Sequence, residues 1–235
     1  MTRRRVAALY VEHDGTYAGL ADVETWDEAR DARTYPGPWP VVAHPPCNTW
    51  CQLASVNQAR WGRMIGDDDG TFAAALAAVR RWGGVLEHPA QSLAWGRYGL
   101  PAPMRGGWVQ SFTDPGVTTE VCQAAYGHEA RKRTWLYAVG VDPVTLDWRD
   151  VPGRAVIGGG IHTGNSAGRP RLEHAIGTPP AFRDLLLALA RSVDPRRATT
   201  GPAATAADRY IDSPARRYHE SRGITGPVDG EAWPS

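Results

Sequence analysis

Lysine is almost missing from this chain. Of the 26 basic residues only Lys132 is a lysine, so a single ammonium side chain stands among many guanidinium groups. The 25 acidic residues leave a formal net charge of +1. This balance excludes a protein that binds nucleic acid or a membrane through a large excess of positive charge, but it permits a local arginine surface.

Cysteine and long apolar runs are also scarce. The three cysteines are Cys47, Cys51 and Cys122, an odd and small set that argues against a disulfide framework and suits a reducing compartment. No window reaches the ~18 apolar residues that a membrane span needs. The apolar stretch after the basic residues 2–5 is too short for a signal peptide. We therefore expect a cytoplasmic protein with no membrane partner.

The length of 235 residues fits one domain with a tail. We expect residues 1–193 to form an α/β catalytic domain. Residues 194–235 are rich in Arg, Pro and Ala and weakly apolar, which predicts a C-terminal tail outside the core. The 26 glycines and 19 prolines predict a surface with many loops.

Several apolar patterns predict the main elements of the fold. Short apolar runs at residues 6–11, Val41–Ala43 and 85–87 predict buried strands. Between the second and third run, Thr71–Trp82 carries apolar residues at helical spacing. A helix between two such strands forms a βαβ unit with parallel strands. A second amphipathic helix is expected at residues 179–192.

The remaining patterns complete the predicted architecture. Two β-type runs, residues 118–124 and 134–139, are joined by a charged segment and predict an antiparallel pair at the sheet edge. Residues 25–33 are polar and predict a short helix or turn. The chain is therefore expected to adopt an α/β fold. Its single Rossmann-like, mostly parallel sheet would be flanked by helices, with an antiparallel edge pair and a C-terminal tail.

Reactive side chains follow two of the predicted strands. One strand ends in Ala-His-Pro-Pro-Cys, which contains His44 and Cys47. The next ends in Glu-His-Pro-Ala-Gln-Ser, which contains Glu87, His88 and Ser92. In an open α/β sheet, ligands bind outside the carboxyl ends of the strands. We therefore expect both segments to line one crevice.

The order of these segments resembles the catalytic core of DNA cytosine-5 methyltransferases. Cys47 follows two prolines, as the nucleophile of that family does, and Glu87 matches the glutamate that grips the cytosine. The arginines of residues 131–133 match the family's arginine-rich turn. The resemblance covers residues 41–140 and extends to uncharacterised phage proteins. The family's paired glycines, which approach S-adenosylmethionine, are missing at residues 12–15, so a kept base pocket and a lost cofactor pocket are implied.

A second resemblance concerns residues 88–93, His-Pro-Ala-Gln-Ser-Leu, which are similar to the His-Pro-Ser-Pro-Leu-Ser loop of uracil-DNA glycosylases. That loop follows a strand and presses on the DNA backbone. A glycosylase needs a flipped base, a carboxylate at the sugar and donors for the departing base. We expect Glu87 or Asp14 to supply the carboxylate, and His44 and His88 to hold the base.

Other side chains are candidates for direct DNA contact. Two tryptophans in the loops near the crevice, Trp50 and Trp95, are expected to stack on bases. Arginine suits bidentate phosphate contacts. The phosphate-contacting residues are expected to be Arg60, Arg63, Ser92, Arg97, Arg131 and Arg133.

These patterns lead to one preferred function and several alternatives. We expect an enzyme that flips a modified cytosine out of double-stranded DNA and cleaves its N-glycosidic bond, without metal or cofactor, as an anti-phage DNA glycosylase would. The first alternative is a cytosine-5 methyltransferase that uses Cys47 and S-adenosylmethionine. A non-catalytic DNA-binding module and a hydrolase of free nucleotides also stay open. A zinc site at Cys47 and Cys51 is disfavoured, because zinc deaminases carry Cys-x-x-Cys rather than Cys-x-x-x-Cys.

Overall fold

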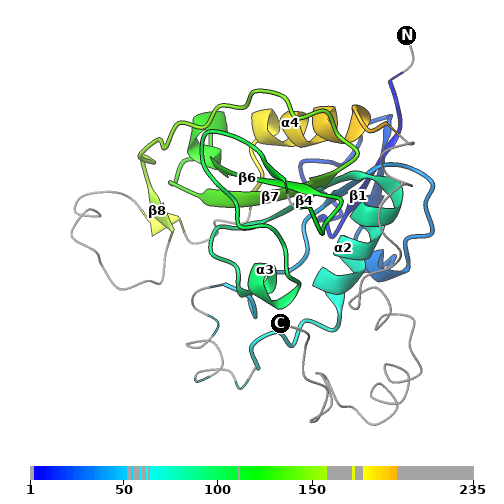
Figure 1. The fold of residues 1–235 in the computed structure, drawn as a ribbon, viewed down its shortest axis with the longest axis horizontal. Helices are drawn as coiled ribbons and strands as arrows, with labels where there is room; N and C mark the ends of the chain where they lie inside the picture. Colours follow the sequence, from blue (N-terminus) through cyan, green and yellow to red (C-terminus); the bar gives the residue numbers. More distant parts are fainter. Residues whose placement is uncertain are drawn as a thin grey trace.

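The computed structural model describes residues 3–51, 54, 59, 62, 64–110, 112–157, 171–172 and 177–194. Within these residues a seven-stranded sheet has the order β2-β1-β3-β4-β7-β6-β5, and a separate small pair is formed by β8 and β9. Figure 1 shows α4 on one side of the sheet and α2 and α3 on the other. The predicted α/β class is therefore confirmed, and the predicted tail lies outside the described residues apart from Asp194, its first residue.

The first half of the sheet is parallel. It consists of β1 (Val6–Leu9), β2 (Val23–Trp26), β3 (Val41–Ala43) and β4 (Gly84–Pro89), with β1 between β2 and β3. Every residue of β1 and β3 is buried, because both faces of the sheet are covered. After β1 the chain adds β2 on one side and β3 on the other. The carboxyl ends of β1 and β3 therefore form a topological switch point, where α/β proteins bind ligands.

The second half of the sheet is antiparallel. β7 (Arg133–Val139) pairs antiparallel with both β4 and β6 (Val117–Cys122), which confirms the predicted antiparallel pair. The pair does not form the outer edge, because β5 (Val109–Gln110) pairs with β6 beyond it. β7 and β5 thus run against the other five strands, and the sheet is mixed but rich in parallel strands.

The prediction of a short helix or turn for residues 25–33 is wrong at its beginning. Thr25 and Trp26 belong to β2, and a 3-10 helix, η1 (Ala32–Thr34), follows after a turn. β2 is the outer strand next to β1, and only Trp26 among its residues is fully buried. Its sequence Val-Glu-Thr-Trp therefore lacks the continuous apolar run that identified β1 and β3.

The helix α2 (Thr71–Trp82) forms as predicted. The carboxylate of Asp68 accepts a hydrogen bond from the backbone N–H of Phe72 at 2.8 Å and so stabilises the first turn. After the helix, Gly84 has a φ of +122°, and a Cβ there would lie 1.9 Å from the carbonyl oxygen of Val41. Only glycine lets β4 begin this close to β3.

The other elements are short apart from one helix. That helix, α4 (Pro180–Arg191), confirms the predicted second amphipathic helix and is one residue shorter at each end. The short elements are α3 (Leu93–Arg97), η2 (Gln123–Tyr126), β8 (Val156–Ile157) and β9 (Arg171–Leu172).

Each face of the sheet has its own hydrophobic cluster. On one face, Phe182 and Leu186 of α4 pack with Val42 and Leu136 of the sheet. On the other face, α2 contributes Phe72 and its apolar neighbours to a cluster that also contains side chains of β1, β3, β4 and β7. Burial of these two faces supplies most of the driving force for folding. Five tryptophans pack partly buried against the clusters: Trp39, Trp82, Trp108, Trp135 and Trp148.

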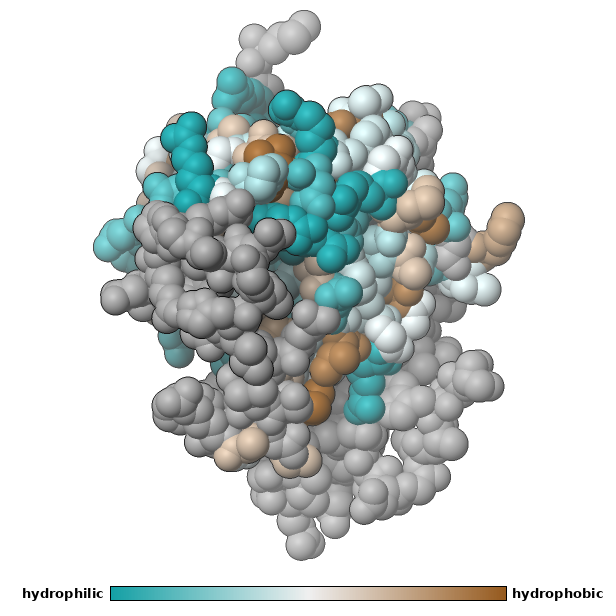
Figure 2. Space-filling view, turned by 90° about the vertical axis from the view of Figure 1, so that its left-hand side faces the viewer, coloured by the Kyte–Doolittle hydropathy of each residue, from teal (hydrophilic) through white to brown (hydrophobic). Residues whose placement is uncertain are grey.

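The described surface carries only scattered large hydrophobic side chains. Figure 2 shows one face on which hydrophilic side chains gather and the hydrophobic ones lie in separate small groups. The most exposed of these large hydrophobic side chains is Phe112. Among the described residues, no helix is long and apolar enough to cross a membrane.

The two clusters predict that core and surface phenylalanines differ strongly in their contribution to stability. Phe72 is fully buried, whereas Phe112 is fully exposed. We expect Phe72→Ala to lower the free energy of unfolding by about 3–5 kcal/mol through lost burial and a cavity. The matched Phe112→Ala variant should change it by less than about 0.5 kcal/mol. Urea denaturation followed by circular dichroism measures both, and equal effects would contradict the assigned core.

Candidate functional site at the carboxyl edge of the sheet

The two predicted segments meet at the carboxyl edge of the sheet. β3 and β4 are parallel neighbours in which Ala43 lies opposite Leu86, so His44 and Glu87 follow at the same level. The Nδ1 atom of His44 lies 3.0 Å from Oε2 of Glu87. Both side chains are nearly buried, with side-chain exposures of 13% and 10%. The sequence therefore placed these two candidates in one site correctly.

The His44–Glu87 pair belongs to a longer buried network. The hydroxyl of Tyr17 lies 2.9 Å from Nε2 of His44, at the end opposite to Glu87. On the other side, the amide of Gln123 donates hydrogen bonds to Oε1 of Glu87 at 3.1 Å and to the hydroxyl of Thr134 at 2.9 Å. Five side chains from different segments thus hold the carboxylate and the imidazole in fixed orientations.

The network keeps Glu87 charged despite its burial. Burial alone would favour the protonated acid, but the hydrogen bond from His44 and the positive charge of Lys132 hold the pKa of Glu87 below its usual range. Burial and the negative charge of Glu87 raise the pKa of Tyr17, whose hydroxyl stays neutral. The buried part of the site therefore consists of the Glu87 anion, hydrogen-bonded to His44, and the neutral Tyr17 hydroxyl, which orients His44.

Two half-buried side chains, Cys47 and Lys132, are the accessible members of the site. Burial, together with the charge of Glu87, raises the pKa of the Cys47 thiol to about 11, and Lys132 only partly opposes this shift. The thiol is therefore protonated at neutral pH. The positive charge of Lys132 lowers the pKa of both Cys47 and Glu87, so the electrostatic influence of this side chain reaches both groups.

Lys132 is held in this position by the backbone. Its carbonyl oxygen accepts a hydrogen bond from the backbone N–H of Gln123 at 2.9 Å. The carbonyl of the next residue, Arg133, accepts one from the N–H of Ala90 at 3.0 Å. The first bond ties the residue before β7 to η2, and the second ties the start of β7 to the loop after β4, the strand that contains Glu87.

The structure places two other candidates, His88 and Ser92, inside the protein rather than in the crevice. His88 is fully buried, and its Nδ1 lies 2.7 Å from the hydroxyl of Ser92. The ring of Phe72 packs edge-on against His88 at 5.1 Å. The Ser92 hydroxyl also accepts a hydrogen bond from the N–H of Ala94 and so caps α3. Both side chains stabilise the loop after β4, and neither faces an open surface.

The tryptophans expected to stack on bases are also buried. Trp50 is 4% exposed, and its indole N–H donates a hydrogen bond to Asp68 at 2.8 Å. Trp95 is 3% exposed and packs against Trp135 at 5.5 Å. In this structure neither Trp50 nor Trp95 presents a ring face to a nucleic acid, and both act as core residues.

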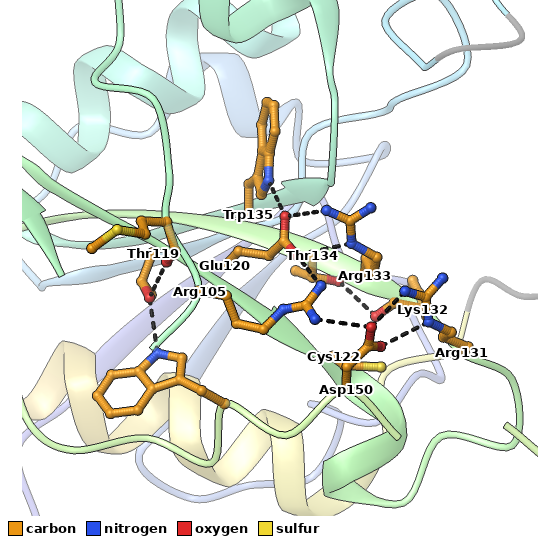
Figure 3. A network of polar contacts seen from close by, with 12 residues as sticks. Arg105, Thr119, Glu120, Cys122, Arg131, Lys132, Arg133, Thr134, Trp135 and Asp150 are labelled. Carbon is orange, nitrogen blue, oxygen red and sulfur yellow. Dashed lines mark hydrogen bonds and ion pairs between the residues drawn. The ribbon is translucent and has the colours of Figure 1, made fainter. Parts of the chain in front are cut away.

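The arginine-rich turn is neutralised by carboxylates, as Figure 3 shows. Arg133 donates two hydrogen bonds to Glu120 at 2.8 and 2.7 Å, and Arg131 donates two to Asp150 at 2.7 and 2.5 Å. Arg105 bridges both acids at 2.7 and 2.9 Å. Partial burial favours the protonated form of Glu120, but the hydrogen bonds from Arg133 and Arg105 lower the pKa of Glu120 to about 2. Arg131 and Arg133 remain 48% and 32% exposed, so part of each guanidinium faces solvent.

The remaining candidates do not join the site. Arg60 and Arg63 lie outside the described residues. Arg97 ends α3 on the exposed surface. Asp14 is exposed and lies outside the network around Glu87. The hydrogen bond that His13 donates to the Asp27 carboxylate, together with the charge of Asp14, raises the pKa of His13.

A cleft of about 1080 Å³ lies beside the site, at the switch point of the sheet. Its walls come from the segments after β1, β2 and β3 and from the segment before α2. Tyr10, His13, Asp27, Pro46 and Asp68 are among the lining residues. Because Pro46 belongs to the loop that carries Cys47, the cleft and the network adjoin. Within the described part of the chain, no group of three or more His, Cys, Asp and Glu side chains is arranged to hold a metal ion.

Sequence reasoning missed four members of the site: Tyr17, Gln123, Lys132 and Thr134. Tyr17, Gln123 and Thr134 carry no pattern in the sequence, because loops and strands far apart in the chain bring them to Glu87. Lys132 did carry a signal, since it is the one lysine among 26 basic residues and stands between two arginines that were selected.

The burial of His88 predicts a loss of stability in mild acid. Burial lowers the pKa of His88 from its unperturbed value of 6.5 to about 4 in the folded protein. Glu87 and the carbonyl of Pro46 favour the protonated form of His88 and oppose this shift only in part. A lowered histidine pKa stabilises the fold above pH 6.5, and this contribution of roughly 3 kcal/mol is lost as the pH falls towards 4.

Urea denaturation from pH 7.0 to 4.5 measures this contribution. We expect the free energy of unfolding to fall with pH in the wild type and to fall less steeply in His88→Gln. His13→Gln, which removes an exposed histidine, should leave the decline in place. A wild-type free energy that stays constant over this range would contradict the buried, neutral state of His88.

Comparison with known proteins gives no external guide to this site. No protein-family model, no curated protein and no solved structure matches the chain significantly. The chemistry of the site therefore rests on its own geometry: a charged carboxylate bonded to a histidine, a protonated thiol and an ammonium group, gathered where α/β sheets bind ligands.

Proposed function

We propose that this protein is a DNA glycosylase that acts on a flipped, modified cytosine. The observation that carries the proposal is the buried Glu87 carboxylate, kept charged and hydrogen-bonded to His44 at the carboxyl edge of the sheet. A charged group inside a protein costs free energy unless it is paired. A buried carboxylate that stays charged at a ligand-binding edge is suited to a reaction in which positive charge develops on the substrate.

Cleavage of an N-glycosidic bond matches what this pair offers. As the bond between C1′ and the base breaks, the sugar gains oxocarbenium character, which a carboxylate such as Glu87 stabilises. The departing base needs a proton or a hydrogen-bond donor, and in this proposal His44 supplies one at Nε2, where the base replaces the hydroxyl of Tyr17. Glu87 keeps His44 oriented through Nδ1, and Gln123 fixes Glu87.

The protonation states favour base removal over methyl transfer. A cytosine-5 methyltransferase attacks the ring with a thiolate and binds the cytosine edge with its glutamate. Here the pKa of the Cys47 thiol is raised, so little thiolate forms at neutral pH. Glu87 is an anion, so it is a poor proton donor and is suited to stabilising a positive charge. In this proposal Cys47 lines the base pocket without attacking.

The placement of the motifs supports DNA as the substrate and a Rossmann-like, methyltransferase-related core as the scaffold. Cys47, Glu87 and the arginines of residues 131–133 meet at one edge, in the order that the resemblance implies. The exposed parts of Arg131 and Arg133 are suited to backbone phosphates. The free cysteines fit a cytoplasmic enzyme.

One observation favours a second candidate, a methyltransferase that uses S-adenosylmethionine. The cleft at the ends of β1, β2 and β3 adjoins the Cys47 loop and has an acidic lining that includes Asp27. Carboxylates accept hydrogen bonds from ribose hydroxyls and attract a sulfonium, so the lining fits such a group even without paired glycines. That cofactor would supply an electrophilic methyl group, and Cys47 would then have to lose its proton.

Mass spectrometry of the products tests the proposal. The protein is incubated with duplexes that contain cytosine, 5-methylcytosine or 5-hydroxymethylcytosine, with and without S-adenosylmethionine. We expect release of a free base from a modified duplex without cofactor. Glu87→Gln should lower the rate about 100-fold or more, because the transition-state charge loses its partner. Cys47→Ser should retain activity.

Controls separate chemistry from folding. Glu129→Gln changes an exposed glutamate on the η2–β7 connection and should leave base release unchanged. Methyl transfer that requires S-adenosylmethionine and is abolished by Cys47→Ser would replace the glycosylase by the second candidate. Tight DNA binding with no product from any duplex, unaltered in Glu87→Gln, would indicate a binding module.

A further inference from the structure

Lys132 differs from every other basic residue in its chemistry. The chain uses arginine at all other basic positions, including the two neighbours of Lys132. Arginine and lysine both carry positive charge, but only the lysine amine adds to a carbonyl carbon and forms an imine. A position that kept lysine in so arginine-rich a chain is therefore a candidate for amine chemistry.

The surroundings of Lys132 support this interpretation. Arg131 and Arg133 on either side turn towards Asp150 and Glu120, as Figure 3 shows. Side chains alternate between the two faces in extended backbone, which directs Lys132 to the opposite face, where Glu87 lies. Lys132 is half-buried, and no described residue forms an ion pair or a hydrogen bond with its ammonium group.

We propose that the amine of Lys132 is a catalytic nucleophile that forms an imine with C1′ of the target deoxyribose. The proposal rests on the glycosylase function above and deepens it, because the enzyme would then also cleave the DNA strand as a lyase. Lys132 and Cys47 are both half-buried, and the charge of Lys132 influences Cys47 and Glu87. In this proposal the amine, His44 and the charged carboxylate of Glu87 surround one position for the sugar.

The reaction balances without any oxidant or reductant. The ammonium group of Lys132 first gives a proton to solvent. The neutral amine then attacks C1′ as the bond to the base breaks, and the bonding electrons leave with the base. The proton that the attacking nitrogen loses next reaches the base through Nε2 of His44, where the base takes the place of the Tyr17 hydroxyl. The C1′–O4′ bond then breaks as the C1′=N bond forms, and O4′ takes a proton from water. Removal of a C2′ proton expels the 3′-phosphate, and hydrolysis of the imine frees Lys132.

Borohydride trapping tests the proposal, because sodium borohydride reduces an imine to a permanent protein–DNA bond. One duplex carries a preformed aldehydic abasic site, and a second series carries cytosine, 5-methylcytosine or 5-hydroxymethylcytosine. We expect the wild type to be trapped on the abasic duplex and on the modified duplex from which it releases a base. Peptide mapping should locate the adduct on Lys132, and strand cleavage should accompany it.

Matched variants exclude a nonspecific amine reaction. Lys132→Arg keeps the charge and should lower trapping and strand cleavage to the level without borohydride or enzyme. The double variant Lys132→Arg/Arg149→Lys places an amine at a 75%-exposed arginine paired with Asp147, and it should not be trapped. Trapping of the double variant, or an adduct mapped to the chain's α-amine, would overturn the proposal.

The outcomes separate the lysine from the base-release reaction. Release of a free base with no trapped species on either duplex would refute the imine and leave the glycosylase intact. Trapping through Lys132 on the abasic duplex, with no base released from any other duplex, would support the amine and refute base release. Absence of both results would refute both.

Discussion

The parallel pairing of β3 with β4 determines everything that the site can do. Ala43 lies opposite Leu86, so His44, the first residue beyond β3, meets Glu87 of β4 at one level. The 3.0 Å contact between His44 and Glu87 follows from that register. A shift of one residue would turn Glu87 to the face occupied by α2, where the hydrophobic cluster offers a carboxylate no partner.

The same register explains why one strand end contributes one residue to the candidate site and the next residue to the core. Glu87 and His88 are adjacent, and alternation along β4 directs them to opposite faces. Glu87 meets His44, Gln123 and the charge of Lys132. His88 meets the rings of Phe72 and Trp95 and the hydroxyl of Ser92. Two residues that a motif treats as one unit therefore have unrelated roles.

The sequence predicted the elements that carry a periodic hydrophobic pattern. It did not predict contacts between side chains that are far apart in the chain. The buried strands β1 and β3, the helix α2 and the antiparallel pair had clear hydrophobic patterns, and all of them form. β2 and β5 are short outer strands without such patterns. The pairing of His44 with Glu87 followed from the rule that strand ends share an edge. The burial of Trp50 and Trp95 could not be read from loops of ambiguous polarity, nor could the carboxylates that occupy Arg131 and Arg133.

The single lysine has a practical consequence for anyone who handles the protein. Within the printed sequence, the only amines are the ε-amine of Lys132 and the α-amine of the chain. An acylating dye applied at a pH that favours internal modification therefore reports on one location, the edge beside Glu87. The rate of that labelling measures how accessible this edge of the sheet is to a molecule from solution. A ligand that binds at the edge should slow the labelling of Lys132.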